Sequence, residues 1–191
     1  MKKVLWMVAV LGMAASFALG EDMVDNPAYK QWSAFKVGTM VKQASTTVMT
    51  VADKEMTTKT TITTTLKELT PEKAVIEMVI EMDMNGQKTA MPAQSTTIPA
   101  KVAKDAATQP AAPPGVKVTE KGKGDEEIEV GGKKYKCHWV EMEMTSDQFS
   151  TTSKTWTCAD VPGGTVKMVS ETTKPMKSKT TMEMVEFKPG T

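Results

Sequence analysis

From Met40 onward the chain alternates between hydrophobic and polar side chains with a period of two. This is the repeat of a β-strand with one buried face. The alternation is clearest between Ala74 and Met84. There the side chains separate into an apolar face and an acidic face, made respectively of Ile76, Met78, Ile80, Met82 and Met84, and of Glu77, Glu81 and Asp83. The pattern predicts a strand whose hydrophobic face is covered.

Turn residues divide the rest of this region into strands. Asn85-Gly86 and Gly131-Gly132 are typical of two-residue hairpins, and Pro92 predicts a bend or a sheet edge. The predicted strands cover 40–51, 55–69, 74–84, 87–98, 116–121, 128–130, 134–145, 151–158, 165–173 and 180–188. About nine or ten strands in hairpin order predict a mainly β protein, an antiparallel β-meander curled into a half-barrel or barrel.

Two segments depart from the alternation. Asn26-Pro27 is a helix-start signal, and aromatic side chains follow it at helical spacing, so that 27–36 is predicted to be a short N-terminal helix. Residues 99–115 are rich in Ala and Pro, and we expect a long exposed loop there, with one helical turn around 102–107. Neither flank has enough apolar residues for a second core, which predicts a single β-rich domain over 21–191.

Residues 1–20 have the organisation of a signal peptide. Lys2 and Lys3 precede a short apolar run, and Ala18 and Gly20 supply small residues before a cleavage site. The apolar run is shorter than the ~20 residues that cross a bilayer. We therefore expect a periplasmic or extracellular protein with a cleaved signal peptide and no transmembrane segment after cleavage.

Composition and charge narrow the classes of function. The chain has 191 residues, 24 Lys, no Arg and a formal net charge of +1. Bidentate Arg contacts to phosphate are thus absent, and we expect no nucleic-acid partner. The chain has one His, and it has none of the sequence motifs of serine hydrolases, zinc peptidases, phosphate-binding loops or Rossmann folds. We expect neither enzymatic activity nor a cofactor.

The two cysteines flank a predicted hairpin. In its register Cys137 faces Cys158 and Trp139 faces Trp156, with both pairs on the same face. A signal peptide implies an oxidising compartment, so we predict a disulfide between the two cysteines that contributes about 3 kcal/mol in the chain-entropy model. A redox pair or a zinc site using His138 is less favoured, because the spacing is not CxxC and the ligands are too few.

Methionine occurs 17 times, and six of these residues form M-x-M pairs in three predicted strands: Met82 and Met84, Met142 and Met144, Met182 and Met184. Flexible Met side chains can fill the core of a curved sheet, line a pliable groove for a lipid or another hydrophobic ligand, or bind Cu(I) through thioethers. For the groove we predict contacts from residues that share one concave surface: Ile76, Met78, Ile80, Met82, Met84, Val140, Met142 and Met144.

Threonine occurs 28 times, with a run from Thr60 to Thr65 broken by Ile62. Threonine suits a pleated surface because it is β-branched. A regular array of hydroxyls would need threonines at matching positions of neighbouring strands, and the sequence shows no such repetition. We therefore expect an ordinary solvent-facing strand.

Two short stretches carry a resemblance. The first is Asn26-Pro27 with Tyr29, Trp32, Phe35, Lys36 and Gly38, and the second is Trp156 followed by Val161-Pro162-Gly163-Gly164 and Val166-Lys167. Together they resemble small secreted proteins of unknown function from planctomycete-type bacteria, with their W…VPGG-x-VK signature. The resemblance implies a secreted β-meander and no known activity. More remotely, a sheet wrapped on a short helix is similar to the half-barrel of periplasmic lipoprotein carriers, which hold acyl chains in an apolar cavity.

These patterns favour a secreted, non-enzymatic binding protein that carries a lipid or another hydrophobic ligand in a Met-lined groove. One alternative is a structural or protein-interaction module of the periplasm or cell surface, with a filled core. A second alternative is Cu(I) handling through the M-x-M pairs. The expected partner is accordingly a hydrophobic small molecule or a protein.

Overall fold

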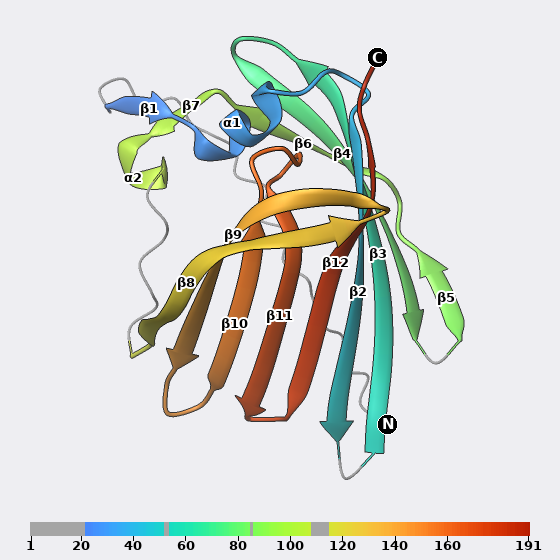
Figure 1. The fold of residues 1–191 in the computed structure, drawn as a ribbon, viewed down its shortest axis with the longest axis vertical. Coiled ribbons are helices and arrows are strands. Elements are labelled where there is room, and N and C mark those ends of the chain that lie inside the picture. Colours follow the sequence, from blue (N-terminus) through green and yellow to red (C-terminus); the bar gives the residue numbers. More distant parts are fainter. Residues whose placement is uncertain (1–21, 52–53, 85, 108–114) are drawn as a thin grey trace.

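A long antiparallel sheet, curved into an open half-barrel, makes up most of the computed structural model (Figure 1). The structure describes residues 22–51, 54–84, 86–107 and 115–191. The predicted signal peptide, the turn residues Asp53 and Asn85, and 108–114 of the predicted loop lie outside these residues. The prediction of a mainly β, half-barrel-like fold is confirmed.

Ten strands form this sheet, in the order β5-β4-β3-β2-β12-β11-β10-β9-β8, and β6 pairs beside β5 along the same edge of β4. Their bounds are β2 (Met40–Val51), β3 (Lys54–Leu69), β4 (Lys73–Met84), β5 (Gln87–Ala90), β6 (Gln94–Pro99), β8 (Lys117–Val130), β9 (Lys133–Thr145), β10 (Ser150–Thr157), β11 (Thr165–Lys174) and β12 (Ser178–Lys188). The predicted strand over 87–98 is divided around Pro92 into β5 and β6, which lie at an edge of the sheet as predicted. Strand β8 also includes residues 122–127, which were predicted to lie between two strands.

The order of the strands corrects the expectation of one continuous meander. The strands form two meanders, β2 to β6 and β8 to β12, and β12 returns to pair with β2 in the middle of the sheet. The first and last long strands are therefore neighbours, although a simple meander would place them at opposite edges. The free edges are β8 on one side and β5 with β6 on the other, so that the half-barrel stays open between them.

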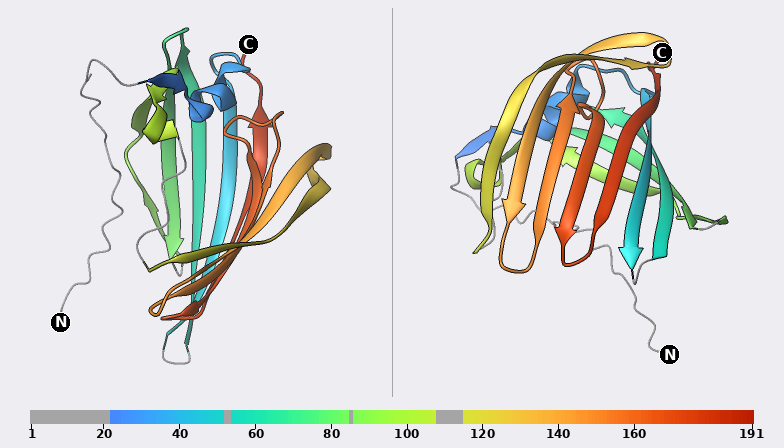
Figure 2. Two further views of the ribbon diagram at one scale, coloured as in Figure 1. Left: turned by 90° about the vertical axis from the view of Figure 1, so that its left-hand side faces the viewer. Right: turned by 60° about the horizontal axis from the view of Figure 1, so that its bottom comes forward.

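Helix α1 (Pro27–Ser33) lies inside the curve of the sheet and packs against β4 and β6 (Figure 2). The side chain of Asn26 caps the helix by accepting a hydrogen bond from the N–H of Ala28 at 3.0 Å, and Pro27 opens it, as predicted. The helix ends at Ser33, earlier than expected. The reason is that the N–H of Phe35 donates to the carbonyl of Trp32 in a tighter, three-residue turn.

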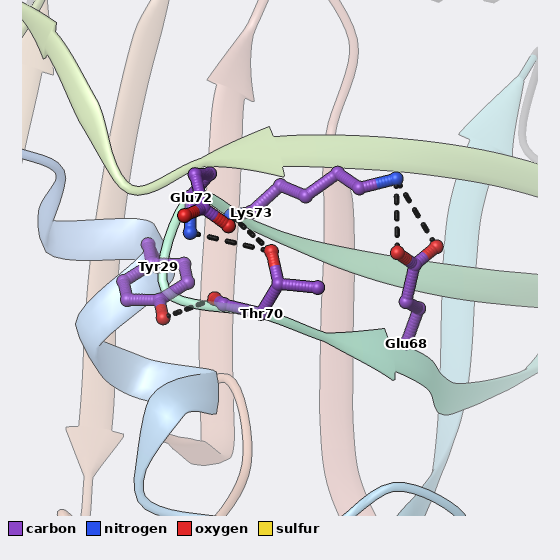
Figure 3. Close-up of polar contacts among 5 residues, drawn as sticks. All are labelled: Tyr29, Glu68, Thr70, Glu72 and Lys73. Atoms are coloured by element: carbon purple, nitrogen blue, oxygen red, sulfur yellow. Dashed lines mark hydrogen bonds and ion pairs between the residues drawn. The ribbon is translucent and has the colours of Figure 1, made fainter.

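The turn between β3 and β4 holds α1 in place (Figure 3). The hydroxyl of Tyr29 donates to the carbonyl of Thr70 at 2.7 Å. The Thr70 hydroxyl accepts from the backbone N–H groups of Glu72 and Lys73, at 3.2 Å each, and so fixes the turn itself. Lys73 then pairs with Glu68 across the base of the turn, at 3.0 Å. The helix is thereby fastened to a rigid part of the sheet.

A second, two-stranded sheet corrects part of the loop expected over 99–115. β7 (Lys101–Ala103) pairs antiparallel with β1 (Met23–Asp25), which lies nearly 80 residues earlier in the chain. Helix α2 (Lys104–Ala107) follows, within the predicted helical turn. The pairing depends on a partner that is remote in sequence, so the Ala and Pro content of the segment gave no sign of it.

The buried core lies at the end of the sheet nearest α1. Inside the curve it includes Trp32, Leu66 and Met184. On the outside, the β8–β9 hairpin folds back across β10, β11 and β12 (Figures 1 and 2), and the core there includes Tyr135 and Trp156. One end of the half-barrel is thus packed on both sides of the sheet.

Glycines in β8 make room for the indole of Trp139 at this end. Gly124 is directly opposite Trp139, and a Cβ atom at Gly124 would lie 3.0 Å from the indole Nε1. The Nζ of Lys154 lies 3.9 Å from the centroid of the same indole ring. Trp139 itself is directly opposite Trp156, which confirms the predicted register of the β9–β10 hairpin.

The predicted disulfide is absent from the structure: Cys137 and Cys158 are free thiols, and both are buried. The backbone N–H of Cys158 donates to the carbonyl of Gly164 at 2.7 Å, so that Cys158 belongs to the loop after β10 and not to the ladder with β9. The thiol of Cys137 donates to the carbonyl of Tyr135 at 3.5 Å. Burial, followed by the effect of the nearby Cys158 thiol, raises the pKa of Cys137 to about 11.

Candidate ligand-binding face

The residues predicted to contact a ligand all lie on one face of the sheet. Directly opposite residues of antiparallel strands point to the same side, so the face can be followed from β4 to β9. One row joins Met82 to Val140 through Thr60, Ser45, Met182, Met168 and Thr155. Alternation along β4 and β9 then adds the remaining predicted residues, which are Ile76, Met78, Ile80, Met84, Met142 and Met144.

This face is the inside of the half-barrel, and we call it the inner face. It comprises the even positions 74–84 of β4 and 56–66 of β3, the odd positions 41–49 of β2, the even positions 178–184 of β12 and 168–172 of β11, the odd positions 151–155 of β10 and the even positions 140–144 of β9. Helix α1 covers one end, where Phe35 packs edge-on against Phe187 with ring centroids 6.1 Å apart.

Burial decreases along the inner face from α1 toward the hairpin turns at the other end. Leu66 and Met184 are 0% and 2% exposed, whereas Met56 and Met84 are 44% and 51% exposed. The other seven predicted ligand residues are half-buried. The inner face is therefore a trough that is filled at the helix end and open to solvent over the rest. A purely structural module would bury this face along its whole length, and the exposed Met56 and Met84 differ from that.

A row of hydroxyl groups crosses the trough near its open end, one row in from the hairpin turns. Thr58, Thr47, Thr180, Ser170 and Ser153 are directly opposite one another on the adjacent strands β3, β2, β12, β11 and β10, and we call them the hydroxyl row. Met84 and Met142 continue the row at its two ends. The hydroxyls of Thr47 and Thr180 hydrogen-bond to each other at 3.0 Å.

The hydroxyl row corrects the expectation that threonines do not recur at matching positions of neighbouring strands, although its member on β3 is Thr58, just before the run 60–65. Threonines do recur at matching positions of neighbouring strands, but the neighbours come from both meanders. Thr58 and Thr47 belong to the first meander, and Thr180 with the two serines belongs to the second. The pairing of β2 with β12 aligns them, and no local sequence signal predicts that pairing.

Charge separates the two faces of the sheet. Over the positions that define it, the inner face carries Thr, Ser, Gln and apolar side chains and no charged residue. The outer face carries charge on each of the same strands, for example Lys59, Glu81, Glu141 and Lys154. At the edge strand β8, Glu120 and Lys123 are directly opposite Met142 and Val140, so they continue the inner face with two charged groups that pair with each other at 3.0 Å. Between β4 and β9 the trough therefore offers hydrogen-bonding and apolar groups without an ionic partner.

The M-x-M pairs share the inner face but stand apart on it. β4, β12 and β9 are separated from one another by three strand spacings each, or roughly 14 Å between neighbouring pairs along the sheet. That separation is too large for two pairs to bind one metal ion together. Met168, which the sequence did not single out, is directly opposite Met182 and brings a further thioether to the middle of the trough.

Other polar clusters lie outside the trough. A pocket of about 760 Å³ is lined in part by Asp125, Cys137 and His138. Here His138 Nδ1 lies 3.1 Å from Asp125 Oδ1, in an exposed pair. Within the described ranges, no group of three or more His, Cys, Asp or Glu side chains could hold a metal ion. None of the helices that the structure describes has the length and hydrophobicity to cross a bilayer.

Comparisons with known proteins give likenesses of fold. No family model matches the chain, and no curated protein matches it. Among solved structures it is similar to an exported protein with a YmcC-like fold from Bacteroides fragilis, with 11% identity and a TM-score of 0.40 over 81% of this chain and 97% of that one. It is also similar to a LolA superfamily protein from Nitrosomonas europaea, with 9% identity and a TM-score of 0.24 over 88% of this chain and 94% of that one.

A third likeness is to an outer membrane lipoprotein-sorting protein domain from Vibrio parahaemolyticus, with 8% identity and a TM-score of 0.27 over 86% of this chain and 91% of that one. At these TM-scores the likenesses support no conclusion about ligand or activity. The resemblance to secreted planctomycete-type proteins stays a prediction.

Proposed function

We propose that this protein is a secreted, non-enzymatic binding protein that holds a hydrophobic ligand in the trough of the inner face. The observation that supports this most directly is the inner face itself: a concave surface of half-buried Met and Ile side chains, uncharged from β4 to β9 and closed at one end by α1. Methionine lines much of it, and flexible thioether side chains can adapt to ligands of different shapes. The location outside the cytoplasm rests on the signal peptide predicted for residues 1–20.

Covering the trough would be energetically favourable. Apolar burial contributes about 0.8 kcal/mol per methylene, so a chain of ten methylenes gains about 8 kcal/mol before the costs of association. The filled end near α1 limits how far a ligand can enter, and the exposed Met56 and Met84 stand at the end where it would leave. The trough therefore suits an elongated molecule that enters from the side of the hairpin turns.

The test is binding by the mature chain, followed by displacement of the uncharged dye N-phenyl-1-naphthylamine and by native mass spectrometry after mild purification. We expect dye fluorescence to rise on binding and a co-purified lipid mass to be present. Ile80→Asn places an amide on the inner face and should weaken dye binding at least tenfold. Val79→Asn places the same amide on the outer face, one residue away, and should change it less than twofold.

Failure of the wild-type chain to bind the dye or any lipid would contradict the proposal, as would equal losses in the two variants. A retained protein mass would favour the interaction module instead. A Cu(I) mass on an otherwise ligand-free chain would favour metal handling.

A further inference from the structure

The absence of charge from the trough and the hydroxyl row across it together restrict the ligand. A carboxylate, phosphate or ammonium group that is taken out of water needs a partner of opposite charge or several strong hydrogen bonds, because burying an unpaired ion is costly. The inner face has no such partner on β4, β3, β2, β12, β11, β10 or positions 140–144 of β9. Lysines are close in sequence but point away from the trough. Lys59, for example, lies between Thr58 and Thr60, on the outer face.

The hydroxyl row supplies the complementary chemistry. Each hydroxyl has one donor and two acceptor sites, so the bond of 3.0 Å between Thr47 and Thr180 leaves both oxygens able to bond further. Thr58, Thr47 and Thr180 are half-buried, and none of the side-chain polar atoms that the structure describes in this region is buried without a partner. Their side chains are thus partly exposed on the inner face, and their hydroxyls can accept from a ligand hydroxyl or donate to an ester carbonyl.

The position of the row sets where each part of a ligand would lie. Toward α1 the next row combines Met182 and Met168 with Thr60, Ser45 and Thr155, and the row after it places Ile62 directly opposite Ile80. Toward the hairpin turns Met49 and Met56 lie directly opposite each other on β2 and β3, and Ser178, Thr172 and Thr151 continue their row on β12, β11 and β10. An apolar chain would therefore contact the methionines and isoleucines, while its polar group would rest on the hydroxyl row.

From these observations we infer that the ligand is an uncharged amphiphile, an aliphatic chain that carries hydroxyl or ester groups and no ionised group. The inference rests on the proposed function and deepens it, because it names the chemical class that the trough selects. Anionic and cationic amphiphiles of the same chain length are disfavoured, since their head groups would meet no counter-charge on the inner face between β4 and β9, and at the β8 edge Lys123 is already paired with Glu120.

The experiment compares four ligands with the same eighteen-carbon chain by displacement of N-phenyl-1-naphthylamine from the mature protein at pH 8. These are 1-monoolein, methyl oleate, oleate and oleylamine, each below its aggregation concentration. We expect 1-monoolein to bind at least tenfold more tightly than oleate and oleylamine. Oleate or oleylamine binding as tightly as 1-monoolein would overturn the inference and leave the proposed function standing. If none of the four displaces the dye from a chain that binds it, the inference also fails and the proposed function stands; if the chain does not bind the dye or any lipid, the proposed function itself fails.

Two matched pairs of variants assign the selectivity to the inner face. 1-Monoolein has two free hydroxyls that methyl oleate lacks, so we expect wild type to prefer it at least fivefold. Thr47→Val with Thr180→Val removes two row hydroxyls at constant shape, and it should reduce this preference to less than twofold. Thr46→Val with Thr181→Val is the same change at the directly opposite outer pair, and it should leave the preference intact. An unchanged preference in the first variant would overturn the role of the row.

Ser153→Lys adds a cation to the inner face and should tighten oleate binding at least fivefold. Thr152→Lys adds it to the outer face and should not. Circular dichroism checks that each variant keeps the β-sheet spectrum. Equal effects of Ser153→Lys and Thr152→Lys in correctly folded proteins would contradict selection by the charge-free trough.

Discussion

At the residue scale, the chemistry of Cys137 depends on its surroundings more than on its partner. The side chain is 1% exposed and lies between Tyr135 and the loop that begins at Cys158. Burial disfavours the thiolate, and the neighbouring sulfur adds to the effect, so that the pKa rises from 9.0 to about 11. Such a thiol stays protonated at neutral pH and is a poor nucleophile. A buried structural role fits it better than a catalytic one.

This pKa predicts how stability changes with pH. Between pH 9 and 11 the unfolded chain releases the Cys137 proton while the folded chain keeps it, so the free energy of unfolding should fall as the pH rises. The expected loss is about 1–2 kcal/mol, and below pH 9 this thiol should contribute no slope. Urea unfolding of wild type and Cys137→Val at pH 7, 9 and 10.5 measures it as the difference between the two proteins. A difference that does not change with pH would contradict the assignment.

At the scale of elements, α1 covers one end of the trough, and contacts with neighbouring strands and turns hold it in position. Seven residues form too short a helix to be stable alone. It is held by its aromatic face, by its cap at Asn26 and by the bond from Tyr29 to the β3–β4 turn. Asn26 also donates through its side-chain nitrogen to the carbonyl of Pro99, at 2.8 Å, which ties the helix start to β6. The helix thus closes one end of the trough because several strands anchor it.

Removal of the Tyr29 hydroxyl tests this anchoring. Tyr29→Phe leaves the ring in place but takes away the donor to the Thr70 carbonyl, and we expect a loss of about 1 kcal/mol in the free energy of unfolding. Ser33→Ala is the control, because the Ser33 hydroxyl bonds only locally, to the carbonyl of Lys30, at an exposed site. That variant should stay within about 0.5 kcal/mol of wild type. Chemical denaturation measures both, and equal losses would argue against anchoring by Tyr29.

At the scale of the whole molecule, the pairing of β2 with β12 makes one trough out of two meanders. Met184 illustrates it, because this residue of the last strand packs in one core with Val41 of the first long strand. Met182, two residues earlier on the same strand and the same face, is half-exposed in the open part of the trough. Substitution of Met184 should therefore affect mainly the stability of the fold, and substitution of Met182 mainly the binding of a ligand.

We expect Met184→Ala to lower the free energy of unfolding by about 2–4 kcal/mol, as for other buried methionines. Met182→Ala should cost less than about 1 kcal/mol and should instead weaken binding of N-phenyl-1-naphthylamine. Denaturant unfolding followed by tryptophan fluorescence and by circular dichroism gives the first quantity, and dye titration gives the second. A larger loss of stability in Met182→Ala than in Met184→Ala would contradict the described burial.

Much of the fold was predictable because its signals are local. The alternation in 74–84 gave the strand and its apolar face, Asn26-Pro27 gave the helix start, and the segments around Trp139 and Trp156 gave the hairpin register. The eight predicted ligand residues share one face for the same reason, since alternation fixes a side within each strand. The predicted disulfide is not formed in the structure, although the predicted register does bring the Cys137 and Cys158 thiols close together.

The sequence by itself determined which side chains share a face of each strand, since that depends on a repeat of two residues. The tertiary structure decided which strands are neighbours, because pairing depends on contacts between residues far apart in the chain. The contact of Thr47 with Thr180 is of this kind, and so is the pairing of Val24 with Val102. The hydroxyl row, the open trough and its freedom from charge follow from that pairing, and so does the ligand class inferred from them.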